Sequence, residues 1–370
     1  MTEAEYENRN GYYDTIVIGG GQTGLTVGYN LVQRGVDFVI LDANERVGDA
    51  WRKRWDSLLL FTPARYNGLP GMPFPAKADA FVTKDEVAAY LEAYAEANDL
   101  PVRSNTRVSR VSHDGETYVV EAGGGELRSR NLVIAMANYQ VPLVPDFAPD
   151  LDPGIVQMHS SRYLRPSQLP DGPVLVVGLG NSGADIGLEL AQTRETYIAG
   201  VPGPVIPFRI EPWFGRNVSV RLVRFATIKV LNTNTFIGRK ARPKMLQHTG
   251  GPIVRVKPGD LVAAGAHRVP RVTGVDHGRP VLSDGTMLDV ASVVWCTGFR
   301  HGFDWIDLPV FDVHGLPIHE RGVVASQPGL YFCGLFFLHA LWSETLTGMP
   351  IDAKYIADRL VERQEEALTG

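Results

Sequence analysis

Two stretches of the chain share one pattern of apolar and polar positions. Each begins with a short apolar run, Thr15–Ile18 in the first and Val174–Val177 in the second. An apolar run of this length predicts a strand buried on both faces, as in a parallel sheet. A glycine-rich turn and a longer amphipathic segment follow each run. The pattern therefore predicts strand, turn and helix twice, separated by enough chain for a whole domain.

The first of these stretches has the spacing Gly19-x-Gly21-x-x-Gly24. The first glycine allows a tight turn, the second lets a pyrophosphate approach the backbone, and the third lets the helix pack on the strand. The helix is expected to run to about Gly35, and the strand after it ends in Asp42. A carboxylate at that point is suited to hold a ribose diol, so we predict a dinucleotide site here.

The second stretch repeats the spacing with Gly178-x-Gly180-x-x-Gly183 and a helix that contains Ile186. Its next strand is followed by Val201, where neither an arginine for a 2′-phosphate nor an acid for a free 2′-hydroxyl stands. Two intact loops predict two nucleotides bound at once, a flavin and a nicotinamide, but this sequence does not choose between NADH and NADPH.

Two other apolar segments call for interpretation. The longest, 330–342, is too short to span a bilayer and predicts a buried strand and turn. Residues 218–231 mix apolar side chains with cations, within a region, 207–258, that has eleven Lys and Arg but one acid. Four apolar residues fall at helical spacing there: Leu222, Phe225, Ile228 and Leu231. We favour a helix that packs its apolar face inward; the alternatives are weak contact of 218–231 with an anionic membrane surface, or a helix that covers the mouth of the substrate pocket.

Composition narrows the function classes. The chain has 370 residues, ordinary apolar content and a net charge of −5, which does not favour binding to nucleic acid. Cys296 and Cys333 are its only cysteines and form no CxxC motif, so no dithiol centre and no metal site is predicted. The acidic start is no signal peptide, and a reducing cytoplasm fits best.

The two loops, with the motifs around them, make the chain resemble the two-dinucleotide flavoproteins. Within that group it looks most like the flavin-containing monooxygenases and their small bacterial relatives. The resemblance covers nearly the whole chain and includes Gly48-x-x-Trp51, "LLLFTPARYNGLPGMPFP" at 58–75, "HSSRY" at 159–163, "VVWCTGF" at 293–299, "PGLYFCGL" at 328–335 and "SETLTGMPIDA" at 343–353.

The resemblance implies an α/β fold of two Rossmann-like three-layer domains, with the NAD(P)-binding domain inserted into the FAD-binding domain. The expected boundaries are 1–142 and 291–370 for the FAD-binding domain and 143–290 for the NAD(P)-binding domain. It implies FAD in the first loop and NADPH or NADH in the second. The cofactor-binding residues expected from motif and resemblance together are Gly19, Gly21, Gln22, Thr23, Gly24, Asp42, Trp51, Gly178, Gly180, Asn181, Ser182, Gly183, Gly298, Gly334 and Asp352.

Three departures from the family pattern stand out. The linker motif F-x-G-x-x-x-H-x-x-x-F/Y keeps His159 and Tyr163, but its glycine is displaced to Gly154. Tyr163 also stands where Baeyer–Villiger members have tryptophan. Relatives usually have Ala-Thr-Gly where this chain has Ala-Met-Ala at 135–137, and Val201 stands where relatives that use NADPH carry arginine.

The resemblance implies an FAD-dependent monooxygenase that uses NAD(P)H and O2. Its substrate would be a small amine, sulfide or 2-oxo acid, oxygenated through a flavin 4a-hydroperoxide. No catalytic residue is assigned, although Thr62 and Asn67 are polar candidates beside the flavin. The alternatives are an NAD(P)H oxidase or flavin-linked reductase, and a non-catalytic redox-sensing flavoprotein. A homodimer is an assembly that this interpretation allows.

Overall fold

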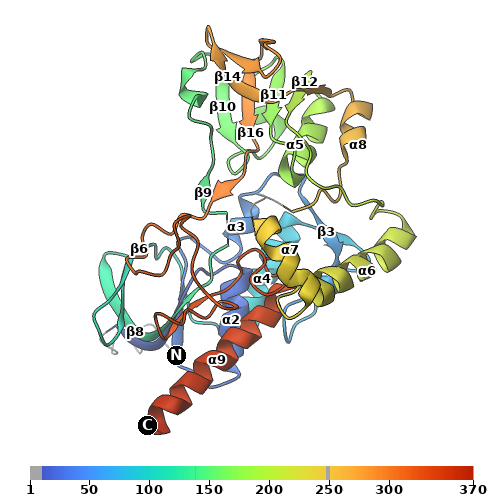
Figure 1. Cartoon of the computed structure of the whole chain (residues 1–370). Helices are drawn as coiled ribbons and strands as arrows, with labels where there is room; N and C mark the ends of the chain where they lie inside the picture. The colour runs from blue at the N-terminus through green and yellow to red at the C-terminus, as the bar shows by residue number, and fades with distance from the viewer. Residues whose placement is uncertain (1–10, 138, 247–250, 370) are drawn as a thin grey trace.

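The computed structural model describes residues 11–137, 139–246 and 251–369. Two sheets dominate it, one in each of two lobes, and the chain passes from the first lobe to the second and back (Figure 1). This arrangement confirms the α/β fold with parallel sheets that the two strand–turn–helix patterns predict.

The first sheet has the strand order β5-β2-β1-β8-β7-β6, and β18 pairs with β8. Strand β1 lies in parallel between β2 and β8, so both of its edges are hydrogen-bonded. Its side chains enter two cores: Val17 packs on one face, and Ile16 and Ile18 pack on the other. The strands are β1 (Tyr12–Ile18), β2 (Phe38–Leu41), β5 (Val102–Arg103), β6 (Val108–His113), β7 (Tyr118–Ala122), β8 (Gly125–Ile134) and β18 (Leu330–Phe332).

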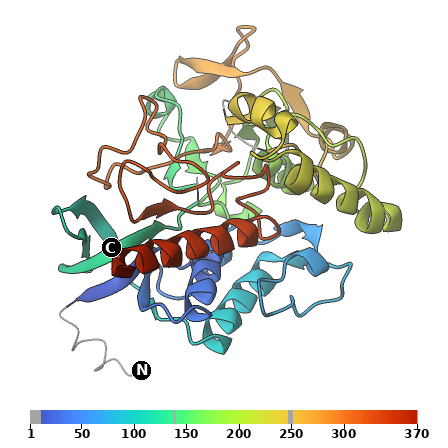
Figure 2. The same ribbon diagram turned by 60° about the horizontal axis from the view of Figure 1, so that its bottom comes forward.

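Three helices form the layer on the Val17 face of this sheet. They are α2 (Gln22–Val32), α4 (Lys84–Ala97) and α9 (Met349–Thr369). Helix α4 begins with a capping box, in which Thr83 Oγ1 accepts a hydrogen bond from the Glu86 N–H and Glu86 accepts one from the Thr83 N–H. Helix α9, from the far end of the chain, lies against α2 (Figure 2). The C-terminal segment therefore completes the lobe that the N-terminal segment begins.

The second sheet is parallel throughout, in the order β10-β16-β11-β12-β13. Helices α5 (Asn181–Ala191) and α8 (Pro258–Ala263) contribute to the core on one face. The hairpin of β14 (Val272–Asp276) and β15 (Arg279–Leu282) contributes to the core on the other. The sheet strands are β10 (Val156–His159), β11 (Val174–Val177), β12 (Thr196–Ala199), β13 (His267–Val269) and β16 (Ser292–Trp295).

The two passages between the lobes lie side by side. Strand β9 (Val141–Pro142) leads into the second lobe and pairs antiparallel with β17 (Phe299–Arg300), which leads back. Strand β16 belongs to the second sheet, although the boundary expected at 291 assigns it to the first domain. Only three residues separate β16 from β17, and composition does not change between them. The sequence therefore does not mark the point at which the second domain ends.

The basic region forms helices at the edge of the molecule. A continuous helical segment is composed of η4 (Gly215–Ser219), α6 (Val220–Phe225) and η5 (Ala226–Val230), and α7 (Phe236–Leu246) follows it. The inward packing that we favoured is only partly correct, because Ile228 is buried but Leu222 and Phe225 are 64% and 61% exposed. The buried face of the helix contains Val220 and Ile228. Leu222 and Phe225 lie on the opposite face and are exposed to solvent.

The apolar segment 330–342 is β18 followed by turns, as predicted. Among the described residues, no helix has the length and apolar character that crossing a membrane requires.

Candidate functional site

The first glycine loop, residues 19–24, joins β1 to α2 by a route that only glycine permits. Gly19 has a φ of +107°, and a Cβ there would lie 3.0 Å from the Ala135 carbonyl oxygen. A Cβ on Gly24 would lie 1.8 Å from the Gly19 carbonyl oxygen, because the first turn of α2 crosses directly over the loop. A Cβ on Gly21, in contrast, would meet nothing within 4 Å. The loop is closed on its inner side and open at Gly21.

Residue 21 is also the point at which α2 begins. Gly21 is the N-cap, no side chain caps the helix, and its first turn has no acidic residue. The first N–H groups of a helix have no intrahelical partner and lie at the positive end of the helix dipole. The opening beside Gly21 therefore has the geometry and charge to bind a phosphate group.

The second glycine loop, residues 178–183, joins β11 to α5 with the same geometry. Gly178 has a φ of +106°, and a Cβ on Gly183 would lie 1.9 Å from the Gly178 carbonyl oxygen. Gly180 is the uncapped N-cap of α5, and a Cβ there would meet nothing within 4 Å. The second lobe thus presents a second phosphate-sized opening at a helix N-terminus.

Asp42 follows β2 directly and fixes the first loop. Its carboxylate accepts hydrogen bonds of 2.6 Å from the Gly20 N–H and of 2.6 Å from the Asn44 N–H. Carboxylate oxygens have further lone pairs, so this side chain can still accept from a sugar hydroxyl. The carboxylate is held beside the glycine loop, where a nucleotide ribose would lie.

At the equivalent point of the second lobe, the chain carries no acid. Val201 is 66% exposed, and Gly200 before it has a φ of +127°. The guanidinium of Arg268, on the neighbouring strand β13, donates a hydrogen bond of 3.0 Å to the Gly200 carbonyl oxygen. In the described part of the chain no carboxylate forms an ion pair with Arg268, and its Nε has no partner. A cation therefore lies at the end of β12.

Three segments that are distant in sequence meet at the start of α2. The Trp51 indole N–H donates a hydrogen bond of 2.9 Å to the Gln22 side-chain oxygen, and the Gln22 amide donates to the Glu344 carbonyl oxygen at 3.3 Å. Gly334 has a φ of +81°, and a Cβ there would lie 2.5 Å from Thr23 Oγ1. The loop before α9 is thereby held against the opening of the first glycine loop.

Asp352 is a buried carboxylate in the first turn of α9. It is 1% exposed, and neither of its oxygens makes a hydrogen bond within the described residues. Arg321 Nε lies 3.7 Å from Asp352 Oδ1, too far for a hydrogen bond. Burial raises the pKa of Asp352 to about 6. Ser343 and Arg321 are polar neighbours of this carboxylate and lower its pKa, and its oxygens have further lone pairs that could accept from a hydroxyl group.

Thr62 and Asn67, the polar candidates from the sequence, bond to each other. The Thr62 hydroxyl donates to Asn67 Oδ1 at 2.5 Å, and the Asn67 amide donates back to the Thr62 carbonyl oxygen at 3.0 Å. Both residues are buried, and Thr347 joins the same turn through the carbonyl oxygen of Tyr66. This pair shapes the turn after β3 (Leu59–Pro63), and one Asn67 amide hydrogen remains as a donor.

His159 holds the two interlobe passages together. The Ser161 N–H donates to His159 Nδ1 at 3.1 Å, so the ring proton is on Nε2, which donates to the Gly298 carbonyl oxygen at 3.0 Å. The same carbonyl oxygen accepts from the Leu143 N–H, and the Thr297 hydroxyl donates to the Leu143 carbonyl oxygen. Burial lowers the pKa of His159, which keeps the imidazole neutral at pH 7.

Tyr163, the other linker residue, lies elsewhere. Its ring is fully buried in the core of the second lobe, and its hydroxyl donates to Glu189 on α5 at 2.6 Å. Asn181 also has structural partners, since its amide donates to the Pro252 carbonyl oxygen and its oxygen accepts from the Val254 N–H. Ser182 follows it in the first turn of α5.

Sequence reasoning missed a group of side chains at the passages. Tyr139 packs edge-on against Phe299, with ring centroids 5.6 Å apart, and Phe299 packs edge-on against His159 at 4.8 Å. Tyr139 is 45% exposed, and burial by the surrounding protein, followed by the Glu344 carboxylate, raises the pKa of its hydroxyl. Burial lowers the pKa of Arg54, whose charge also lowers that of His159.

These residues were missed because they come from three distant segments. The only local signal was the unusual Ala-Met-Ala at 135–137, which lies two residues before Tyr139. In the basic region, the Arg209 guanidinium donates two hydrogen bonds to the Asp260 carboxylate, so it is not free to bind the nicotinamide coenzyme.

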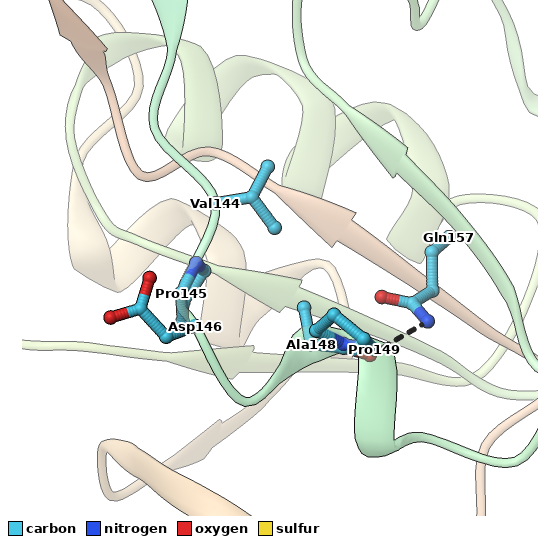
Figure 3. A pocket seen from close by; sticks show the side chains of 6 residues that line it. All are labelled: Val144, Pro145, Asp146, Ala148, Pro149 and Gln157. Carbon is cyan, nitrogen blue, oxygen red and sulfur yellow. Dashed lines mark hydrogen bonds between the residues drawn. The ribbon is translucent and has the colours of Figure 1, made fainter.

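Two hollows lie away from the glycine loops. One, of ≈ 550 Å³, lies beside the first passage, where the Gln157 amide donates to the Ala148 carbonyl oxygen (Figure 3). A second, of ≈ 430 Å³, lies between Phe81 and Leu188. Neither hollow is lined by residues of the glycine loops. The candidate site is instead placed at the loops, because Gly21 and Gly180 are open and stand at uncapped helix N-termini. No group of three or more potential metal ligands occurs within the described residues.

Comparisons with known proteins agree with this geometry. Residues 16–203 match the family model for pyridine nucleotide-disulphide oxidoreductases. The chain is 36% identical to an uncharacterized CzcO-like oxidoreductase of Geobacillus kaustophilus, over 94% of this chain and 98% of that protein. It is 27% identical to the indole-3-pyruvate monooxygenase YUCCA4 of Oryza sativa, over 94% of this chain and 87% of the relative. The structure resembles a flavin-containing monooxygenase from Stenotrophomonas maltophilia, with a TM-score of 0.76, 28% identity, and coverage of 95% and 99%.

Proposed function

Because the chain belongs to the pyridine nucleotide-disulphide oxidoreductase family, we propose that it is a flavin-dependent monooxygenase that binds FAD in its first lobe and NADPH in its second. The observation that supports this most is the pair of equivalent openings, at Gly21 and Gly180, each beside an uncapped helix. When bound, FAD accepts reducing equivalents from a nicotinamide and reacts with O2.

The residues of the first lobe fit FAD. The N-terminus of α2 would hold the pyrophosphate at Gly21, and Asp42 would accept from the adenosine ribose. Asp352 has two buried oxygens without hydrogen bonds, which suit the hydroxyl groups of the ribityl chain. Gln22 and Trp51 fix the loop that would cover the nucleotide.

The second lobe suits a coenzyme with a 2′-phosphate. Gly180 and the N-terminus of α5 would hold its pyrophosphate. No carboxylate follows β12 to repel a phosphate or to hold a free 2′-hydroxyl, and the Arg268 guanidinium reaches the end of that strand. We infer that Arg268 contributes the charge that the sequence does not show near Val201.

Residues at the two passages between the lobes would position the lobes and the substrate during the reaction. His159 is neutral and fixes Gly298 and Leu143 through one carbonyl oxygen, which would keep the two lobes in register during electron transfer. Tyr139 and His159 both pack against Phe299 at these passages, and we place the small organic substrate beside them. The substrate would be an amine, a sulfide or a 2-oxo acid, as the resemblance implies.

One observation favours a second candidate, an NADPH oxidase that oxygenates no substrate. Met136 stands where relatives have threonine, and its side chain packs beside Gly19, within 3.3 Å of where a Cβ would lie. The chain therefore lacks the hydroxyl that relatives carry at position 136, which removes one polar group beside the first loop.

One experiment separates the two candidates. The purified protein is reduced anaerobically with NADPH or NADH, and O2 is then admitted with amines, sulfides or 2-oxo acids present. We expect rapid reduction by NADPH and an oxygenated product from one substrate class. Peroxide equal to the NADPH consumed across the whole panel would instead identify an oxidase. Protein purified without FAD would contradict both.

A further inference from the structure

In the helical segment Gly215–Val230, two large apolar side chains, Leu222 and Phe225, point to solvent and do not pack against the protein. Residues four, seven or eight and eleven positions apart lie on one face of a helix. The face that points to solvent carries both apolar residues and cations. It consists of Phe214, Arg221, Leu222, Phe225 and Lys229, all exposed. We call this set of residues the outer stripe.

Other cations of the same segment point inward. The Arg216 guanidinium lies 5.1 Å from the centre of the Phe81 ring, and the Arg224 guanidinium lies 5.3 Å from the centre of the Tyr66 ring. Guanidinium groups gain stabilisation over aromatic faces, so the segment is attached to the first lobe through these contacts. The attachment directs Leu222 and Phe225 away from the protein.

Exposed aromatic side chains concentrate in this region. Among the described residues, every strongly exposed Phe or Trp lies between 213 and 236: Trp213, Phe214, Phe225 and Phe236. Ile237, in the first turn of α7, is also 56% exposed. Helix α6 lies at the rim of the molecule in both views (Figures 1 and 2). Large exposed apolar side chains that gather in one region of a protein indicate a docking surface.

The charge of the region identifies what would dock. Eleven of the 36 Lys and Arg residues lie in 207–258, but only one of the 41 Asp and Glu residues does. The chain as a whole is negative, with a net charge of −5, so this segment differs from the rest in its excess of cations, of which Arg209 and Arg255 are paired with Asp260 and Asp185. Aromatic and leucine side chains interspersed with Lys and Arg are typical of a helix that lies in the headgroup region of an anionic bilayer.

We propose that the outer stripe, with Trp213 and Phe236, docks the protein on the surface of an anionic lipid bilayer. A second copy of the chain fits less well, because a symmetric contact would place two positively charged surfaces together. The long cations Arg221 and Lys229 reach phosphate groups while Leu222 and Phe225 enter the acyl boundary. The contact is peripheral and reversible, and weakens as salt screens the charges.

The test measures flotation of the FAD-loaded protein with vesicles. Vesicles that contain phosphatidylglycerol should bind it, and vesicles of pure phosphatidylcholine should bind it at least about tenfold less well. Binding should fall as salt is raised. Emission from Trp213 should shift to shorter wavelength on binding, and this shift should vanish in Trp213→Phe.

Matched variants locate the contact. The pair Leu222→Ser and Phe225→Ser should lower partitioning at least about tenfold, because two side chains no longer enter the apolar phase. Ile318→Ser, at a position 57% exposed but outside the region, should change nothing. The reversal Arg221→Glu should reduce binding, while Arg279→Glu, exposed in the second lobe, should not. Because all these side chains are exposed, unchanged thermal melting should show that each variant folds.

Three results would overturn the proposal. The first is no flotation with phosphatidylglycerol vesicles at low salt. The second is equal flotation with both lipids regardless of salt, which would exclude headgroup attraction. The third is a dimer by light scattering that dissociates in the Leu222→Ser and Phe225→Ser pair, since a second copy would then cover the surface.

Discussion

The two glycine loops share one backbone geometry but differ in the side chains at the end of the next strand. Their first glycines have φ values of +107° and +106°, and a Cβ on their third glycines would lie 1.8 and 1.9 Å from a carbonyl oxygen. Asp42 follows the strand after the first loop, whereas Val201 and Arg268 lie at the end of the strand after the second. The phosphate opening is therefore set by backbone geometry, and the choice of nucleotide is left to side chains one strand away.

The largest effect is expected from adding one methyl group at the crossing of either loop. Gly24→Ala and Gly183→Ala each place a Cβ within 2 Å of an oxygen, so the helix must move, at a cost of more than about 4 kcal/mol. Gly24→Ala should lose FAD on purification, measured by flavin absorbance. Gly183→Ala should keep FAD but be reduced by NADPH at least about a hundredfold more slowly.

The control for this pair is the open position of each loop. Gly21→Ala and Gly180→Ala meet no atom within 4 Å, so the apoprotein should melt as the wild type does. Gly21→Ala should still weaken the binding of FAD, and Gly180→Ala the binding of NADPH, because the added methyl group occupies the phosphate opening. Loss of FAD from Gly183→Ala but not from Gly24→Ala would reverse the assignment of the loops.

The next largest effect is expected at Asp352, a buried carboxylate of the FAD-binding lobe. Burial raises the pKa of this carboxyl in the folded protein to about 6, from 3.8. The folded state therefore binds more protons between these values, and the free energy of unfolding falls as pH rises through this window. Asp352→Asn should remove that fall and stabilise the apoprotein by about 3 kcal/mol above pH 6, while it weakens FAD binding.

The measurement is chemical unfolding of apoprotein from about pH 3 to about pH 8, which includes the window between pKa 3.8 and about 6 in which stability should fall. Asp358→Asn, on the same helix, is the control, because the pKa of Asp358 is shifted in the opposite direction. Its pKa is lowered through hydrogen bonds to Lys354 and Arg34 despite partial burial, so its removal should destabilise the protein at neutral pH. Equal pH dependence in wild type and Asp352→Asn would contradict the prediction.

Local patterns predicted the features that depend on the backbone. Thr15–Ile18 and Val174–Val177 lie within β1 and β11, because an apolar run before spaced glycines fits only a buried strand and a tight turn. The helix at 218–231 was predicted, but not its orientation. Spacing shows that Leu222 and Phe225 share a face, whereas the rings of Tyr66 and Phe81 decide which face turns inward.

The site was harder to predict wherever partners come from distant segments. His159 was found by its motif, but its bond to Gly298 spans 139 residues. Asn181 was predicted as a cofactor-binding residue and Thr62 as a polar candidate beside the flavin. Their polar atoms bond to other parts of the chain, which sequence spacing does not reveal. Arg268 was missed because β13 pairs with β12 only in the folded sheet.

Arg268 tests the difference on the nicotinamide side. If its guanidinium bonds the 2′-phosphate, Arg268→Gln should raise the KM for NADPH by about ten- to a hundredfold, the loss of one charge-assisted hydrogen bond. The KM for NADH should change little. The measurement is steady-state flavin reduction with both coenzymes, and Arg271→Gln, an exposed cation two residues after β13, is the control. Equal losses with both coenzymes would place Arg268 in packing rather than in recognition.

The smallest effect is expected from making the second loop more like the first. Val201→Asp introduces a carboxylate after β12, as Asp42 follows β2, at a position exposed enough that stability should stay within about 0.5 kcal/mol. The new charge should repel a 2′-phosphate and shift preference toward NADH by about three- to tenfold, about 1 kcal/mol. Because it would also pair with Arg268, its effect should not add to that of Arg268→Gln in the double variant. Full additivity would mean that the two residues act on different parts of the coenzyme, and the contrast between the loops would then not lie at the strand end.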